Sequence, residues 1–293
     1  MSIRYGIDLP PFGPFGSASV LADVARDAEQ AGWDGVFIWD HVARAWTLDI
    51  ADTWIALAAM ATATERIRLG PLVTPLPRRR PWKVARETVS LDHLSNGRLI
   101  LGVGLGSGRP EEWGNFDEET DLKTRGEMVD EALDILTGLW RGEPFSYDGQ
   151  HYQVKDAHFL PTPFQQPRIP IWTGGYWPNR RPFRRAARWD GAFPLAKNSN
   201  HPGAALLPEQ YRDVTAFVRA ERATDAPFDI VCRGEPTPGD NPARGAEMVA
   251  PYVDAGITWW IEAVHPWVFG RDWEETWPFE AMRERIRQGP PKT

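Results

Sequence analysis

The sequence predicts an α/β fold in which roughly eight strand–helix units close into a single (β/α)8 barrel. Two observations lead to this prediction. Short apolar runs bounded by turn residues alternate with amphipathic segments, and the alternation continues along the chain. The first apolar run is followed by L-P-P-F-G-P-F-G, which lacks the glycine spacing typical of open dinucleotide-binding sheets. We therefore expect one barrel domain over residues 1–293, with a doubly wound open sheet as the alternative.

The N-terminal half of the chain supplies four of the expected units. A strand over 4–9 precedes a helix over 19–31, whose apolar residues recur at helical spacing and which ends at Gly32. The next strand, over 36–39, is apolar throughout, as expected for a strand buried on both faces. By the same criteria we expect helices over 52–64, 82–94 and 123–140, and strands over 67–74 and 98–104.

The C-terminal half begins with an interruption. Residues 144–161 contain alternating side chains around Asp148-Gly149, which predicts a β-hairpin inserted between the fourth helix and the fifth strand. The alternation then resumes. We expect strands over 169–173, 190–195, 228–233 and 258–263, with helices over 182–188, 208–223, 243–255 and 279–287.

Composition excludes several classes of protein. A net charge of −7 argues against nucleic acid or an anionic membrane as a partner. The single cysteine, Cys232, excludes an intramolecular disulfide. There is no signal-peptide pattern and no apolar run near the roughly 20 residues that cross a bilayer, so a cytoplasmic location is expected.

The strongest candidate site residues are Asp40 and His41, at the end of the second strand. Barrel enzymes place their chemistry on the loops after the strands, and histidine exchanges protons near neutral pH. Adjacent residues on a strand point to opposite faces. We expect His41 to act in catalysis with Asp40 beside it; the alternative is a structural Asp40 that accepts hydrogen bonds from backbone amides.

Two glycine-rich turns follow later strands. Gly102 to Gly108 allows a flat ligand to approach the backbone closely. Gly174 and Gly175 precede a helix rich in arginine, so exposed amides and Arg180 could bind a phosphate; a solvated arginine-rich helix is the alternative. The basic residues 78–80 are expected at the surface.

The remaining chemistry-bearing residues indicate a bound cofactor. The six histidines form no H-x-H pair, which argues against a metal centre, and no serine-nucleophile elbow is present. With so few acid–base groups, we expect a bound cofactor to supply the reactive chemistry. The 15 tryptophans could wall an apolar cleft or simply pack the core.

The sequence resembles the bacterial luciferase-like family of flavin- or F420-dependent oxidoreductases. The resemblance rests on A-G-W-D-G-V-F-I-W-D-H, R-I-R-L-G-P-L-V-T-P, L-D-H-L-S-N-G-R-L-I-L-G-V-G-L-G and I-P-I-W-T-G-G, with the T-R-G-E-M-V-D-E-A-L-D-I-L helix and the G-Q-H-Y hairpin. These segments occur in the family's order over residues 5–194. The resemblance implies an eight-stranded barrel that holds reduced FMN or F420 at its C-terminal mouth.

The resemblance also implies roles for individual residues. It places Asp40 and His41 near the cofactor ring and substrate, and a non-prolyl cis peptide near the ring, with Pro71–Leu72 as the candidate bond. The implied cofactor-binding residues are Asp40, Leu72, Val73, Thr74, Gly104, Leu105, Gly106, Ser107, Gly174, Gly175 and Arg180.

One departure bears on the choice of cofactor. Some F420-dependent dehydrogenases carry an acidic glutamate directly after the glycine turn, where this chain has Ser107, with Glu111 and Glu112 further on. This favours an FMN monooxygenase that acts with O2 on a small organic substrate, supplied with reduced flavin by a separate reductase. Its dry pocket would be walled by Trp39, Trp46, Trp172 and Trp177.

Other readings of the chain stay open. An F420-dependent reductase or dehydrogenase, itself served by a separate F420 reductase, is the alternative enzyme. A flavin-binding barrel without catalysis is the alternative from another class, and a metal-dependent hydrolase is more distant. The resemblance leaves a homodimer open.

Overall fold

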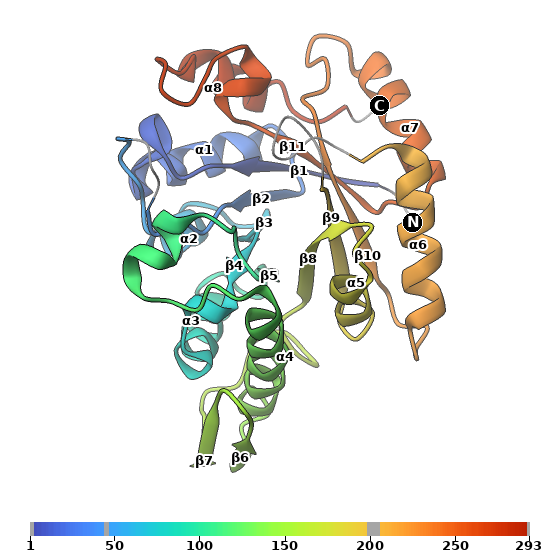
Figure 1. The fold of residues 1–293 in the computed structure, drawn as a ribbon. Coiled ribbons are helices and arrows are strands. Elements are labelled where there is room, and N and C mark those ends of the chain that lie inside the picture. Colours follow the sequence, from blue (N-terminus) through green and yellow to red (C-terminus); the bar gives the residue numbers. More distant parts are fainter. Residues whose placement is uncertain (1–2, 44–46, 198–205, 292–293) are drawn as a thin grey trace.

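A parallel sheet curls through the molecule into a nearly closed barrel (Figure 1). The computed structural model describes residues 3–43, 47–197 and 206–291. Neighbouring strands follow the order β3-β2-β1-β11-β10-β9-β8-β5-β4 and pair in parallel. The strands are β1 (Arg4–Leu9), β2 (Gly35–Ile38), β3 (Arg68–Pro71), β4 (Thr74–Pro75), β5 (Leu101–Gly104), β8 (Ile171–Trp177), β9 (Gly191–Ala196), β10 (Asp229–Gly234) and β11 (Trp259–Ala263).

The third position of the barrel is a broken strand. β3 pairs with β2, whereas β4 pairs with β5, so these two short strands share the place of one predicted strand. Leu69 bridges to Leu99, and the Ile100 amide donates to the Leu69 carbonyl at 2.9 Å, which brings the two ends of the sheet together. The predicted eightfold parallel barrel is confirmed.

A non-prolyl cis peptide lies at the break, between Leu72 and Val73. The predicted bond, Pro71–Leu72, is therefore wrong by one residue. The Leu72 amide still donates to the Ile38 carbonyl at 2.8 Å, so the bond before it belongs to the regular ladder with β2. The chain leaves that ladder only after Leu72.

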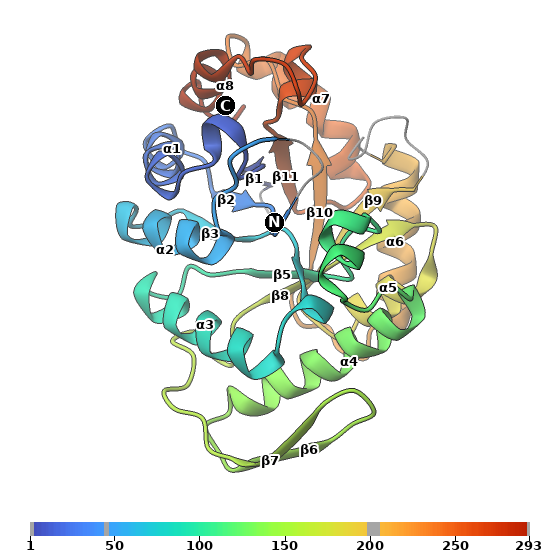
Figure 2. The same cartoon turned by 60° about the vertical axis from the view of Figure 1, so that its left-hand side comes forward.

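Helices surround the barrel and connect its strands (Figure 2). Three of them begin at side chains that accept a hydrogen bond from the first turn: Asp52 from the Ile55 amide, Asp121 from Thr124 and Asn241 from Arg244. Among the described residues, no helix is long and apolar enough to cross a bilayer. The helices are α1 (Ala18–Gln30), α2 (Thr53–Ala63), α3 (Pro81–Leu94), α4 (Leu122–Leu139), α5 (Arg180–Ala186), α6 (Pro208–Glu221), α7 (Pro242–Asp254) and α8 (Phe279–Arg287).

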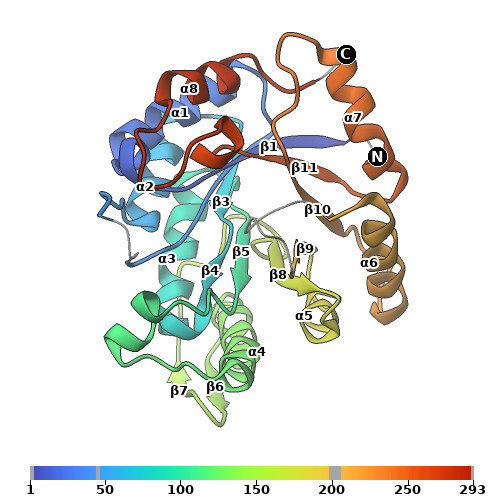
Figure 3. The same cartoon turned by 45° about the horizontal axis from the view of Figure 1, so that its top comes forward.

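The predicted hairpin follows α4 and precedes β8. Its strands, β6 (Phe145–Asp148) and β7 (Gln153–Ala157), are antiparallel and lie beside α4 at the edge of the molecule (Figure 3). The loop starts at the predicted Asp148-Gly149 and closes where the Gly149 amide donates to the Tyr152 carbonyl at 3.0 Å. The hairpin is confirmed.

The inside of the barrel fixes which side chains reach its mouth. An apolar cluster that includes Phe37, Val231 and Ile261 fills the interior. Side chains two residues apart on a strand share a face. Trp39 therefore follows Phe37 on the inner side, and Arg233 follows Val231, each toward the C-terminal ends of the strands.

Candidate functional site

Asp40 is the centre of a buried ion-pair network after β2. Its Oδ1 accepts from Arg78 Nη2 at 3.0 Å and Arg79 Nη2 at 2.8 Å, and its Oδ2 accepts from Thr74 Oγ1 at 2.9 Å. The side chain of Asp40 is 1% exposed, and that of Arg78 is 5% exposed. The expectation that Arg78 and Arg79 are surface residues is therefore wrong, because Asp40 draws both guanidinium groups inward. This network suits Asp40 for holding the loops together.

His41 is paired with a glutamate that lies far away in the sequence. His41 Nδ1 is 2.5 Å from Oε1 of Glu112, which belongs to a 3-10 turn, Pro110–Glu112. Arg78 donates to the other Glu112 oxygen and so connects the pair to Asp40. Burial alone would raise the pKa of Glu112, but the contacts with His41 and Arg78 outweigh it and lower that pKa below its usual value. An anionic Glu112 thus orients His41 at the mouth.

The glycine turn after β5 is held in place by Arg125 of α4. Arg125 of α4 donates from Nε to the Leu105 carbonyl at 3.0 Å and from Nη2 to the Ser107 carbonyl at 2.9 Å. Its guanidinium lies 3.5 Å from the ring centre of Trp113, and burial lowers its pKa to about 10. Gly106 has φ +79°, and a Cβ there would lie 2.5 Å from the Trp113 ring. The turn is therefore preorganised.

Gly174 and Gly175, the glycine pair in β8, face different parts of the structure. A Cβ on Gly174 would lie 3.1 Å from Val73 Cγ1, on the inner side of the barrel. A Cβ on Gly175 would lie 2.3 Å from Pro182 of α5, so this residue faces the helix. The Arg180 guanidinium lies over the ring of Trp177 at 4.2 Å. A phosphate site here stays a prediction.

The predicted tryptophan wall is scattered. Trp39 lies at the mouth, whereas Trp177 packs against Phe183 of α5 at 5.3 Å between ring centres. Trp172 is fully buried near the N-terminal end of the barrel, where its Nε1 donates to Asp229 at 3.3 Å. Trp46 lies outside the described residues. Of the tryptophans proposed to line the cleft, the described part of the chain thus brings only Trp39 to the mouth.

Trp39 belongs instead to an aromatic cluster that sequence reasoning missed. Its ring centre is 6.0 Å from Phe12, 5.9 Å from His41, 6.1 Å from His265 and 5.6 Å from Trp273. The Thr53 hydroxyl at the start of α2 donates to the Trp39 carbonyl at 2.8 Å and fixes the backbone. The tryptophan-rich segment 267–277 was the available signal, but its distance in sequence from Trp39 hid the contact.

The buried His265 predicts acid sensitivity. Burial, assisted by the charge of Arg233, lowers its pKa from 6.5 to about 3. The unfolded chain therefore binds a proton below pH 6.5 that the folded chain refuses, and stability falls as pH falls from 6.5 toward 3. We expect a loss of about 2 kcal/mol between pH 6.5 and pH 5. Urea titrations at several pH values across this range measure the free energy of unfolding. It should change less with pH in His265→Gln than in the wild type. His93→Gln, at an exposed site, is the matched control. An equal change with pH in both variants would contradict this assignment.

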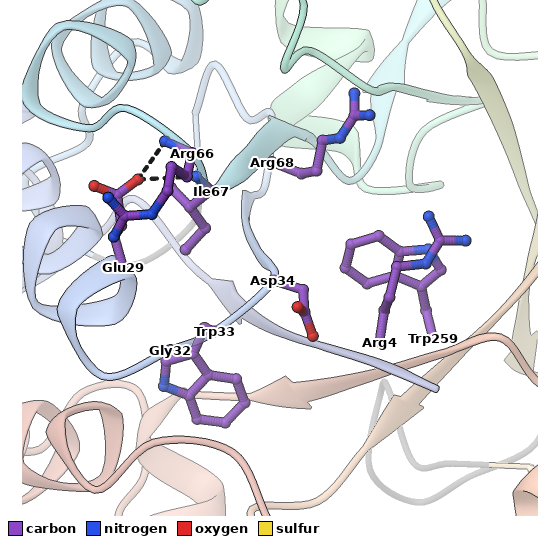
Figure 4. Close-up of a pocket in the computed structure, with 9 residues that line it drawn as sticks. All are labelled: Arg4, Glu29, Gly32, Trp33, Asp34, Arg66, Ile67, Arg68 and Trp259. Carbon is purple, nitrogen blue, oxygen red and sulfur yellow. Dashed lines mark hydrogen bonds between the residues drawn. The ribbon is translucent and has the colours of Figure 1, made fainter. Parts of the chain in front are cut away.

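A separate pocket of about 490 Å³ lies at the opposite, N-terminal end of the barrel (Figure 4). Most of its charged side chains are engaged by neighbouring groups. Arg4 Nη2 lies 2.5 Å from Asp229 Oδ1, Arg68 Nη1 donates to the Gly97 carbonyl at 2.9 Å, and Glu29 accepts from the Ile67 amide at 2.9 Å. Polar groups at this end of a barrel generally serve stability, so the mouth remains the candidate site.

Comparison with known proteins identifies the family. The family described as luciferase-like monooxygenase matches residues 10–288. The chain belongs to this family. A functionally uncharacterised relative of this luciferase-like protein, Mb0965c of Mycobacterium bovis, is 32% identical over 228 residues, which cover 71% of this chain and 74% of the relative.

Relatives with named activities differ in cofactor. An F420-dependent glucose-6-phosphate dehydrogenase of Microbacterium testaceum is 35% identical over 176 residues, 57% of this chain and 48% of the relative. The oxygenase component of a flavin-dependent trigonelline monooxygenase of Acinetobacter baylyi is 27% identical over 163 residues, 56% of this chain and 44% of the relative. The luciferase-like protein thus spans about half the length of each.

Solved structures share the fold at low sequence identity. An F420-dependent secondary alcohol dehydrogenase in complex with an F420-acetone adduct superposes with a TM-score of 0.74 at 16% identity, covering 90% of this chain and 93% of the other. Monooxygenase RslO1 from Streptomyces bottropensis gives 0.73 at 20% identity, covering 98% and 97%. These likenesses establish the barrel architecture.

Proposed function

We propose that this luciferase-like protein is an F420-dependent oxidoreductase that transfers a hydride between the cofactor and a small organic substrate. The observation that carries the proposal is His41 held by the buried Glu112 at 2.5 Å, beside the glycine turn. Oxidation of an alcohol by hydride removal also requires that its hydroxyl proton leave, and a histidine oriented by a carboxylate is suited to accept it. His41 is thus assigned to the substrate proton, and Glu112 positions it.

The residues at the mouth fit a flat cofactor ring. The backbone of 104–107 is preorganised by Arg125, and Ser107 Oγ is buried with no hydrogen-bond partner in the described part of the chain. The ring would lie against this turn and against Val73, with Leu72, Thr74 and Gly174 around it. When bound, F420 would supply or receive the hydride, while the protein orients the reactants and His41 gives up or accepts the matching proton.

Glu112 weakens the sequence argument against F420 by placing a carboxylate beside His41, although its lowered pKa suits it to positioning and not to donating a proton. Ser107 stands where some F420-dependent dehydrogenases carry their acid, but Glu112, five residues later, reaches His41 in the fold. Three matching relatives are F420-dependent glucose-6-phosphate dehydrogenases, with 31–35% identity. The combination favours hydride transfer.

A monooxygenase that takes reduced FMN from a separate reductase is the second candidate. The observation that favours it is the aromatic cluster of Phe12, Trp39 and Trp273 at the mouth, since oxygen chemistry on a flavin must be protected from water. The relative that acts on trigonelline is flavin-dependent.

Separate titrations of the purified protein with F420 and with FMN, followed by the absorbance change of each cofactor, test the choice. We expect F420 to bind at least about tenfold more tightly, and to be reduced when alcohols are added. Tighter binding of FMN would favour the monooxygenase instead. Binding without turnover of any alcohol or carbonyl compound would support a non-catalytic barrel, and binding of neither cofactor would exclude both enzymes.

A further inference from the structure

Asp8, Arg233 and His265 form a buried polar group at the mouth, next to Trp39, whose ring also contacts His41. A Cβ on Gly6 would lie 3.3 Å from the Phe37 ring, so Gly6 faces the interior, and Asp8, two residues later, shares that face. Arg233 lies on the inner face of β10, and His265 follows β11. The exposed fractions are 1% for Asp8, 8% for Arg233 and 5% for His265.

The ion pair between Asp8 and Arg233 uses only part of each side chain. Arg233 Nε lies 3.0 Å from Asp8 Oδ2, and the same oxygen accepts from Trp39 Nε1 at 2.9 Å. Asp8 Oδ1, Arg233 Nη2 and His265 Nδ1 are buried and have no hydrogen-bond partner among the described residues. A buried polar atom without a hydrogen bond lowers the free energy of unfolding. A guanidinium that pairs closely with a carboxylate usually donates to both of its oxygens. A ligand that pairs with these atoms would explain them.

The aromatic cluster places this polar group next to the proposed chemistry. The Arg233 guanidinium lies 4.9 Å from the Trp39 ring centre, and His265 stacks on Trp273 with 5.6 Å between ring centres. His41 lies on the same indole of Trp39 at 5.9 Å. A molecule whose polar end meets Asp8 and Arg233 would thus extend along apolar rings toward His41.

Charge decides the kind of group that fits. Burial raises the pKa of Asp8, whereas Arg233 and the Trp39 hydrogen bond favour its carboxylate form, which offsets the charge of Arg233. His265 is uncharged at neutral pH because burial lowers its pKa to about 3. An anionic group would be attracted by Arg233 and repelled by Asp8 at short range. A neutral group that carries a donor beside an acceptor satisfies both, since it can donate to Asp8 Oδ1 and accept from Arg233 Nη2.

We propose that Asp8 and Arg233 bind the neutral polar end of the substrate, a donor–acceptor group of the kind found in a primary amide. The proposal rests on the proposed function only in assigning this group to the substrate of the His41 site. Asp8 discriminates between ligands of the same shape, because it accepts a hydrogen bond from a neutral ligand and repels an anionic one.

Benzamide and benzoate, which have the same size and differ in charge, test the proposal by calorimetric titration. We expect wild-type protein to bind benzamide at least about tenfold more tightly than benzoate. Asp8→Asn should reverse the preference, because Arg233 then lacks its opposing charge. Arg233→Met should weaken both. Asp130→Asn removes the carboxylate of a distant pair with Arg185 and should leave the preference unchanged.

Several results would overturn the proposal. Binding of neither probe or tighter binding of benzoate to the wild type would do so, and this comparison needs no variant to fold. An unchanged preference in a folded Asp8→Asn protein would do so as well. If Asp8→Asn weakened F420 or FMN binding more than about threefold, the pair would serve the cofactor and not the substrate. Titrations without cofactor keep the result separate from a failure of the proposed function.

Discussion

Replacement of His41 by asparagine is expected to lower kcat by about 10²- to 10⁴-fold, while cofactor affinity changes little. Asparagine keeps a polar group near Glu112 but cannot take up a proton. The loss corresponds to the share of catalysis that a positioned general acid or base usually provides. Single-turnover measurements of hydride transfer to F420, with an alcohol found by screening, measure the effect directly.

Glu112→Gln is the companion variant that separates positioning from proton transfer. It leaves His41 in place but removes the negative charge that faces its Nδ1. We expect a smaller loss of kcat, and an acid limb of the kcat–pH profile that moves to lower pH because the charged imidazole loses its anionic partner. Full activity of His41→Asn with bound cofactor would show that His41 only shapes the pocket.

The architecture was accessible from the sequence because it depends on local patterns. Buried strands of a parallel sheet are apolar throughout, and the apolar residues of amphipathic helices recur at helical spacing, so each unit can be recognised from its own segment of sequence. The position of Asp40 and His41 at a strand end followed from the same patterns. The end of a strand does not follow from these patterns: β8 runs from Ile171 to Trp177, four residues beyond the predicted end. Trp172 therefore lies near the base of its strand, not at the mouth.

The partners within the site could not be predicted in this way. Glu112 reaches His41 across 71 residues of sequence, and no local spacing encodes that contact. Arg78 and Arg79 resemble a solvated basic cluster until Asp40 is known to lie beside them. The interior positions of Asp8 and Arg233 depend on the face that each strand turns inward, which a shift of one residue would reverse.

Loss of the Asp40 side chain is expected to be one of the most destabilising single changes at the mouth. Asp40→Ala leaves the guanidinium of Arg79 without the carboxylate that draws it inward, and leaves Arg78 with Glu112 as its remaining carboxylate partner. Removal of one partner from a buried ion pair typically costs about 3–5 kcal/mol, since the remaining charge is desolvated and unpaired. For a chain of 293 residues, a Tm lower by about 5–8 °C is expected.

Asp23→Ala is the matched control, because it removes an aspartate whose pair with Arg26 is exposed on α1. Exposed pairs contribute about 0–1 kcal/mol, so this variant should unfold close to the wild type. Asp40→Asn, which keeps one acceptor oxygen, should fall between the two. If Asp40→Ala were as stable as Asp23→Ala but lost cofactor binding or turnover, Asp40 would act on the ligand directly. The network with Arg78 and Arg79 predicts instead that Asp40→Ala lowers stability, and that activity falls only because less of the protein is folded.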